Sequence, residues 1–221
     1  MQQLLLELSP PPSPTLENFF PGRNGAALGA LRAALAGGEP CVYLWGAPGS
    51  GKTHLLHAFA RASGADAAYF QTARADWKRL ETLNKIAIDD VFRLDEPGQT
   101  AVFDLCNRLR ASGGALVASG TMPPAELALR ADLRSRLGSG IVLQLHPLGD
   151  AEKARALGEH AAGRGLAMDE SLIGYLLTHF ERDMGTQIAL LDALDRYSLQ
   201  RQRGITLPLL KEVLQQLRAA R

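Results

Sequence analysis

Residues 46–53 have the sequence GAPGSGKT, which matches the pattern G-x-x-x-x-G-K-T. In such a loop the glycines let the backbone wrap around phosphate groups, so that N–H groups and the start of the next helix face the anion. Lys52 would reach the β- and γ-phosphates of a nucleotide, and the Thr53 hydroxyl would bind Mg²⁺. A glycine-rich turn that matches by chance is the alternative. The predicted nucleotide-binding residues of this phosphate loop are Gly46, Ala47, Pro48, Gly49, Ser50, Gly51, Lys52 and Thr53.

Two carboxylates follow a second apolar segment, in the sequence IAIDD at residues 86–90. Ligands of open α/β sheets bind at the carboxyl ends of the strands, where these side chains would lie. We therefore expect Asp89 to hold Mg²⁺ and Asp90 to orient an attacking water. The alternative is a strand end with two solvated aspartates. The five histidines show no spacing typical of a metal site, and we expect them to be structural.

The elements that must position these residues alternate between strands and helices. Short apolar runs predict strands at 41–45, 67–70, 86–88, 115–119 and 141–145, and helical patterns occupy 26–36, 99–112 and 132–137. Such alternation is typical of a parallel sheet covered on both faces. The prediction is an α/β nucleotide-binding domain with a five-stranded parallel sheet at residues 15–149.

The pattern changes after this region, because residues 150–221 contain only helical patterns. Four helices are predicted, at 151–163, 170–180, 184–203 and 207–219, separated by glycines and short polar stretches. We therefore expect a small α-helical lid domain at residues 150–221.

Composition excludes several classes of protein. Of 221 residues 46% are hydrophobic, which is enough for a core without disulfides or metals, and Cys41 and Cys106 lack metal-ligand spacing. Lys and Arg total 24 against 23 Asp and Glu, so no broad basic field indicates DNA binding. No apolar stretch is long enough to span a membrane. The expected location is cytoplasmic.

The chain starts with MQQLLLEL, followed by SPPPSP at residues 9–14. The sequence of residues 9–14 predicts a proline-rich spacer that is semi-rigid and solvated. The apolar start is too short and wrongly flanked for a secretory signal. Leucines at alternate positions suit an extended peptide that binds an apolar groove, whereas a frayed terminus or an edge strand is the alternative.

Several of these segments together resemble DnaA-type ATPases of the AAA+ class. TLENFFPGRNGAA resembles their leading segment, GAPGSGKTHLLHA their phosphate loop and helix, SGTMPPAEL their sensor-1 strand, and DLRSRLGSG the box with their arginine finger. The resemblance covers about residues 15–219. It implies that Phe19 and Phe20 help enclose adenine, that Thr121 takes the sensor-1 position, and that Arg136 is the arginine finger, with Arg134 as the competing candidate. ADP or ATP with Mg²⁺ is the implied cofactor.

The sequence departs from the DnaA-type pattern at two positions. Thr121 stands where many of these proteins have an acidic residue, and Gly185 stands at the expected sensor-2 arginine. Arg182, nearly one helical turn earlier, is a possible substitute. We therefore expect weak ATP hydrolysis at most by the chain itself.

The overall plan resembles the Hda family of DnaA-related regulators, because no helix-turn-helix domain follows the lid up to Arg221. The resemblance implies a protein that binds the DNA-loaded sliding clamp, stimulates hydrolysis of DnaA-bound ATP and so prevents re-initiation of chromosome replication. Contact with DNA and the nucleoid would then be indirect, through the clamp. The clamp-binding motif at residues 1–8 would use Gln3, Leu4, Leu6 and Leu8, with Glu7 where a proline is common. The alternatives are a self-standing AAA+ ATPase or loader, which would place Arg136 at a neighbour's site in a homo-oligomer, and a non-enzymatic nucleotide-dependent adaptor.

Overall fold

The computed structural model describes residues 12–72, 77–80, 82–166, 168–180, 183–201 and 204–219. The chain divides into a larger body, Pro14–Pro147, and a smaller one in its C-terminal part, Leu148–Arg221. The predicted clamp-binding motif at 1–8 lies outside the described residues, as does the first part of the spacer.

A five-stranded parallel sheet organises the larger body, as predicted. The strands are β1 Cys41–Trp45, β2 Ala67–Gln71, β3 Lys85–Asp89, β4 Ala115–Gly120 and β5 Ile141–Gln144. Their order across the sheet is β2-β3-β4-β1-β5, and every neighbouring pair is parallel. The carboxyl ends of all five strands therefore lie at one edge, where the phosphate loop begins.

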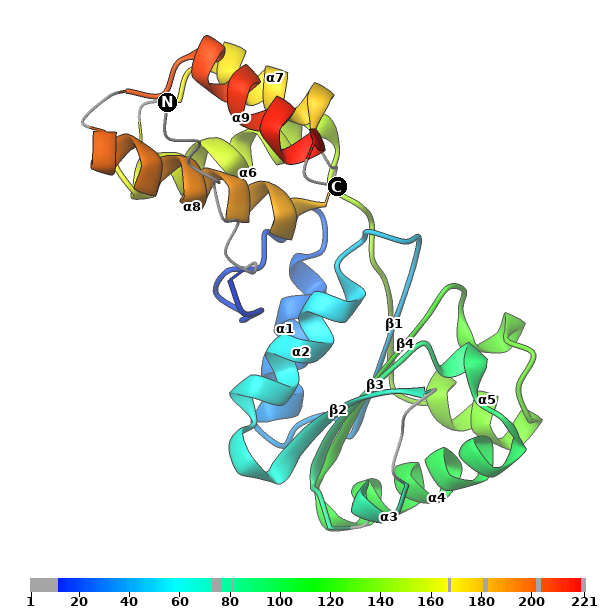
Figure 1. Ribbon diagram of the computed structural model, residues 1–221. Coiled ribbons are helices and arrows are strands. Elements are labelled where there is room, and N and C mark those ends of the chain that lie inside the picture. Colours follow the sequence, from blue (N-terminus) through cyan, green and yellow to red (C-terminus); the bar gives the residue numbers. More distant parts are fainter. Residues whose placement is uncertain are drawn as a thin grey trace. The chain divides into compact units, whose positions relative to one another are not determined.

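Helices cover both faces of this sheet (Figure 1). On one face lie α1 Gly25–Leu35 and α2 Lys52–Ala62, and on the other lie α3 Trp77–Leu80, α4 Glu96–Ser112 and α5 Ala131–Gly138. Short 3-10 turns occupy Gly64–Asp66, Val91–Arg93 and Pro124–Glu126. Along β1, Val42 and Leu44 pack in the cluster on the α1–α2 side, and Tyr43 packs in the cluster on the α4–α5 side. Because both sides of the strand are buried, its sequence is a continuous apolar run instead of an alternating one.

Helix α4 starts three residues earlier than the helical pattern predicts. The carboxylate of Asp95 accepts a hydrogen bond from the backbone N–H of Gly98 at 2.8 Å, and Pro97 occupies the first turn. Both features stabilise a helix start, because the first N–H groups of a helix lack intrahelical partners. The helix ends at Ser112 and is capped by Gly113, whose φ of 71° is readily adopted by glycine.

The smaller body is helical, as predicted for the lid. It contains α6 Asp150–Gly163, α7 Glu170–His179, α8 Met184–Arg201 and α9 Leu207–Ala219. Asp169 caps α7 through the N–H of Leu172 at 2.9 Å, and the carboxylate of Asp183 accepts from the N–H of Thr186 at 2.8 Å at the start of α8. Helices α6 and α8 are joined through Asp192, which contacts His160 at 2.8 Å and Arg164 at 3.1 Å. In the part of the chain that the structure describes, no helix combines the length and apolarity needed to cross a membrane.

Gln187 on α8 carries an unusual buried amide. Its side chain is fully buried, and neither its oxygen nor its nitrogen has a hydrogen-bond partner among the described residues. An unpaired buried polar group costs about 1–3 kcal/mol. We expect Gln187→Leu to raise the free energy of unfolding by about 1–2 kcal/mol, measured as a higher urea midpoint at an unchanged m-value.

Gln99 provides the matched control for this prediction. It is also buried, but its amide donates to the Leu94 carbonyl at 3.1 Å and accepts from the Arg130 N–H at 2.8 Å. Gln99→Leu should therefore lower the urea midpoint, because both backbone groups lose their partner. A lower midpoint for Gln187→Leu would contradict the interpretation of Gln187.

Candidate functional site

The phosphate loop connects β1 directly to α2, and two of its glycines are required by the space around them. Gly46 has a φ of 150°, and a β-carbon there would collide with the carbonyl oxygen of Leu145. Gly51 has a φ of 93°, and its β-carbon would lie 2.7 Å from the ring of Phe19. The loop therefore lies tightly against the end of β5 on one side and the leading segment on the other. This close backbone approach is what a phosphate cradle needs.

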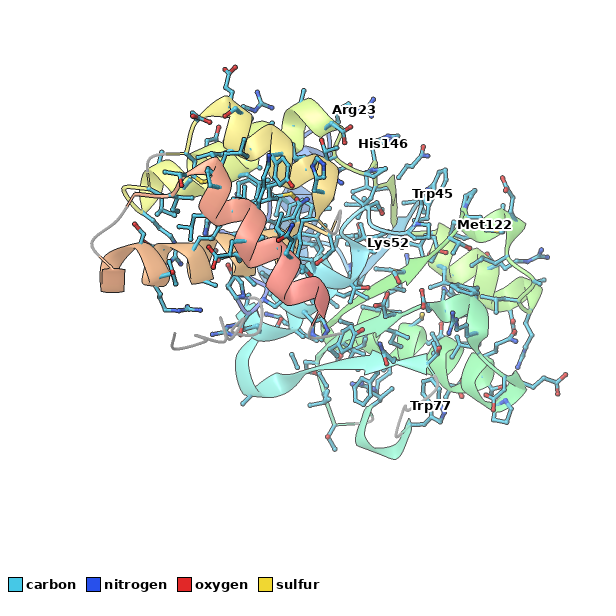
Figure 2. The ribbon with its side chains drawn as sticks, turned by 45° about the horizontal axis from the view of Figure 1, so that its top comes forward. Arg23, Trp45, Lys52, Trp77, Met122 and His146 are labelled. Carbon is cyan, nitrogen blue, oxygen red and sulfur yellow. The ribbon has the colours of Figure 1, made fainter. Side chains whose placement is uncertain are left out.

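The ammonium group of Lys52 contacts the backbone of this loop (Figure 2 labels Lys52). Its Nζ donates to the carbonyl oxygens of Gly46 at 2.8 Å and Ala47 at 3.0 Å, and lies 3.4 Å from Ser50 Oγ. Lys52 is buried, and burial lowers the pKa of its ammonium, while the charges of Asp89 and Asp90 act in the opposite direction. A phosphate that entered the loop would replace these carbonyl contacts with charge-assisted hydrogen bonds, which are stronger.

The structure brings Asp89 and Thr53 together, although 36 residues separate them in sequence. Thr53 Oγ1 donates to Asp89 Oδ2 at 2.7 Å. Asp89 also accepts hydrogen bonds from the hydroxyl of Tyr69, at 2.9 Å, and from the hydroxyl of Ser119. Asp89 is buried with 4% of its surface exposed, so these three donors stabilise a carboxylate that has little access to water. Burial, followed by the charge of Asp89, raises the pKa of Tyr69.

These groups fit a magnesium ion bound together with a nucleotide. Mg²⁺ prefers oxygen ligands and is usually held by one or two protein groups, water and substrate phosphates. Thr53 is exposed at the start of α2, and its hydroxyl oxygen lies beside the buried carboxylate of Asp89. Thr53 and Asp89 would therefore hold the ion, and the ion would neutralise charge on the phosphates.

Asp90 has a backbone conformation unlike that of its neighbours. Its φ of 57° and ψ of 49° are left-handed, the one such case among the described non-glycine residues. Its N–H donates to Ser119 Oγ at 3.0 Å, and its carboxylate lies 3.8 Å from Arg93. Burial and the charge of Asp89 raise its pKa. Strained backbone of this kind is concentrated at functional sites.

The leading segment lies beside the phosphate loop, where the two predicted adenine-binding phenylalanines occur. The ring of Phe19 lies against Gly51 and 5.5 Å from the ring of His54, and Phe20 is half-buried. The buried side chain of Asn24 joins this segment to the end of β5, because it pairs with both backbone groups of His146 at 2.8 Å (Figure 2 labels His146). Phe19 is thus held next to the phosphate loop, and its adenine contact stays a prediction.

Thr121, the predicted sensor-1 residue, lies one position beyond the end of β4 and is exposed. The polar side chain of β4 that contacts Asp89 is Ser119, two residues earlier. We did not predict Ser119 or Tyr69 from the sequence. The alternation of side chains along the strand could have indicated Ser119. Side chains two residues apart lie on the same face of a strand, so Ser119 lies with Val117 on the face of β4 that meets α1 and α2.

Arg136 lies near the opposite edge of the sheet from the phosphate loop. The thiol of Cys41, the first residue of β1, contacts the Arg136 carbonyl oxygen at 3.9 Å, whereas the loop follows the last residue of β1. Five residues of strand at about 3.3 Å each separate these edges, which exceeds the reach of an arginine side chain. The guanidinium lies 5.8 Å from the ring centre of Phe103, and no carboxylate among the described residues is within ion-pair distance of it. Arg134 instead donates to the Ala125 carbonyl at 3.4 Å.

In the lid, Gly185 lies in the first turn of α8 and therefore carries no side chain there that could contact a phosphate. Arg182, the possible substitute, lies outside the described residues.

Comparison with known proteins agrees with this architecture. Residues 150–214 match the family described as Hda, lid domain. Among solved structures, domain III of the replication initiation protein DnaA from Thermotoga maritima has a TM-score of 0.71 at 21% identity, over 94% of this chain and 98% of that one. AMPPCP-bound DnaA from Aquifex aeolicus has a TM-score of 0.69 at 23% identity, over 86% of this chain and 70% of that one. A RuvB mutant from Thermotoga maritima has a TM-score of 0.66 at 19% identity, over 93% and 72% of the two chains.

The likeness to solved structures concerns the fold, and the lid match carries the more specific relationship. The solved structures share the fold that contains the five-stranded parallel sheet, and the family model matches the helical region that follows it. Residues 150–214 therefore match the Hda lid family, and the chain as a whole has the fold of DnaA domain III.

Proposed function

We propose that the larger body binds ADP or ATP together with Mg²⁺. The observation that carries this proposal is the convergence of Lys52, Thr53 and Asp89 at the carboxyl edge of the sheet. Lys52 would bind the β- and γ-phosphates, and Thr53 and Asp89 would hold the ion. The choice of adenine rests on the fold, because DnaA structures with the same fold contain AMPPCP.

We further propose that the protein acts on the nucleotide of a partner, namely DnaA. Arg136 is too far from the chain's own phosphate loop to serve it, and its guanidinium has no ion-pair partner in the described part of the chain. An arginine supplied to a neighbour's γ-phosphate stabilises charge that develops in the transition state. Gly185 removes one expected phosphate contact from the protein's own site, so its own hydrolysis should be slow while nucleotide binding persists.

Regulatory inactivation of DnaA is the function that combines these features. The N-terminal motif at residues 1–8 would tether the protein to the DNA-loaded sliding clamp, and Arg136 would then stimulate hydrolysis of DnaA-bound ATP. The lid match to the Hda family supports this proposal. The protein would meet DNA through the clamp, near the nucleoid in the cytoplasm.

The tether is tested by replacing Leu4 and Leu6 together with alanine. We expect a pull-down with purified clamp to lose at least tenfold in binding, because two apolar side chains leave the groove at about 1.5–3 kcal/mol each when fully buried. Clamp-dependent hydrolysis of DnaA-bound ATP should fall in parallel, while ADP affinity stays unchanged.

Replacing Leu5 and Glu7 with alanine gives the matched control, because in an extended peptide these positions face away from the groove. Equal clamp binding by the Leu4/Leu6 variant and the intact protein would refute the tether. Steady ATP turnover by the protein alone, without clamp or DnaA, would instead favour a self-standing ATPase.

A further inference from the structure

Three hydroxyl groups surround the buried carboxylate of Asp89, which is more than its proposed role in metal binding requires. Thr53 and Tyr69 donate to Oδ2, at 2.7 and 2.9 Å, and Ser119 donates to Oδ1. A carboxylate offers about four lone-pair positions. Only one of them is left for a metal-bound water when all three hydroxyls stay in place.

The contact with Tyr69 follows from the register of the sheet. Tyr69 on β2 is paired with Ala87 on β3, so Asp89 is the diagonal neighbour two residues further along the same face. Diagonal neighbours lie within reach of long aromatic side chains. The phenol therefore extends along the sheet until its hydroxyl meets the carboxylate at the strand end.

Stacking fixes the direction of the Tyr69 ring. The imidazole of His57, on α2, lies with its ring centre 3.7 Å from that of Tyr69 and at an interplanar angle of 26°. His57 lies four residues after Thr53, one helical turn along α2. One helix thus supplies both the hydroxyl that would bind Mg²⁺ and the ring that orients the competing phenol.

We propose that Tyr69 is a positioning residue whose hydroxyl stabilises the Asp89 carboxylate when no metal is bound, and so makes nucleotide binding less dependent on Mg²⁺. This inference rests on the proposed nucleotide site. A buried carboxylate needs hydrogen-bond donors or a cation. Tyr69 supplies a donor permanently, so the cation contributes less to the affinity for nucleotide than it would beside an unpaired carboxylate.

The test measures the dissociation constant of ADP by calorimetry, once with excess Mg²⁺ and once with EDTA. We expect the ratio of the ADP dissociation constant in EDTA to that in Mg²⁺ to rise about tenfold or more in Tyr69→Phe, because one hydrogen bond to a charged group is lost. The melting temperature of the variant in EDTA without nucleotide should also fall. His57→Ala, which leaves the phenol in place but frees its ring, should raise the ratio by a smaller factor.

Tyr43→Phe is the matched control, because the Tyr43 hydroxyl also makes one buried hydrogen bond, to the Met122 carbonyl at 2.9 Å, but does not contact Asp89. For Tyr43→Phe, the ratio of the ADP dissociation constants in EDTA and in Mg²⁺ should equal that of the wild type. An unchanged or lower ratio in Tyr69→Phe would overturn the inference while leaving the nucleotide site intact. Failure of the wild-type protein to bind ADP at all would instead overturn the proposed function.

Discussion

Arg136→Ala is expected to abolish stimulated hydrolysis of DnaA-bound ATP, with a loss of about 10³-fold or more in rate. The reason is that the guanidinium would stabilise negative charge that appears on the transferring phosphoryl group only in the transition state. The measurement is release of radiolabelled phosphate from ATP-loaded DnaA in the presence of clamp-loaded DNA. Clamp binding and ADP affinity of the variant should stay at wild-type values, because Arg136 lies at the edge of the sheet opposite the phosphate loop.

Two further variants make this prediction specific. Arg136→Lys keeps the charge but loses the planar fork that contacts phosphate through two N–H groups, so most of the stimulation should be lost as well. Arg134→Ala is the matched control, because Arg134 lies on the same helix and its guanidinium donates to the Ala125 carbonyl. If Arg134→Ala abolishes stimulation and Arg136→Ala does not, the arginine-finger assignment is wrong.

Lys52→Met is expected to weaken ADP binding about 10- to 100-fold, because charge-assisted hydrogen bonds to the phosphates are lost. Methionine keeps most of the side-chain volume, so the loop should keep its shape. The melting temperature without nucleotide should change little, since the variant loses two carbonyl contacts but no longer buries a charge. Calorimetry with ADP and a thermal melt without it measure both effects.

Lys85→Met is the matched control for Lys52→Met. The ammonium of Lys85 also donates to a backbone carbonyl, that of Leu35 at 2.7 Å, but it lies at the start of β3, away from the phosphate loop. The Lys85→Met variant should therefore bind ADP with wild-type affinity. Equal affinity of the Lys52→Met variant and the wild type would show that phosphate binding does not use the loop.

The fold was predictable from the sequence because local patterns define its elements. Continuous apolar runs predicted all five strands, and the change to purely helical periodicity after residue 149 predicted the lid. Two details of the helices were not predicted. Helix α4 begins three residues earlier than expected, because Asp95 and Pro97 stabilise its start. The four-residue helix α3 was not predicted, because four residues are too few to show a helical period. Neither the start of α4 nor the short helix α3 changes the sheet that positions the site.

The sequence by itself determined the phosphate loop and the Asp89–Asp90 pair, because the spacing of these residues along the chain is what the chemistry requires. Only the tertiary structure decided which groups surround Asp89. Ser119 is its neighbour because β4 lies beside β3, and Tyr69 reaches it because β2 pairs with β3 in a particular register. Likewise, the placement of Arg136 near the start of β1 separates it from its own phosphate loop. Strand order and register bring together residues that are distant in sequence, and no local pattern encodes that choice.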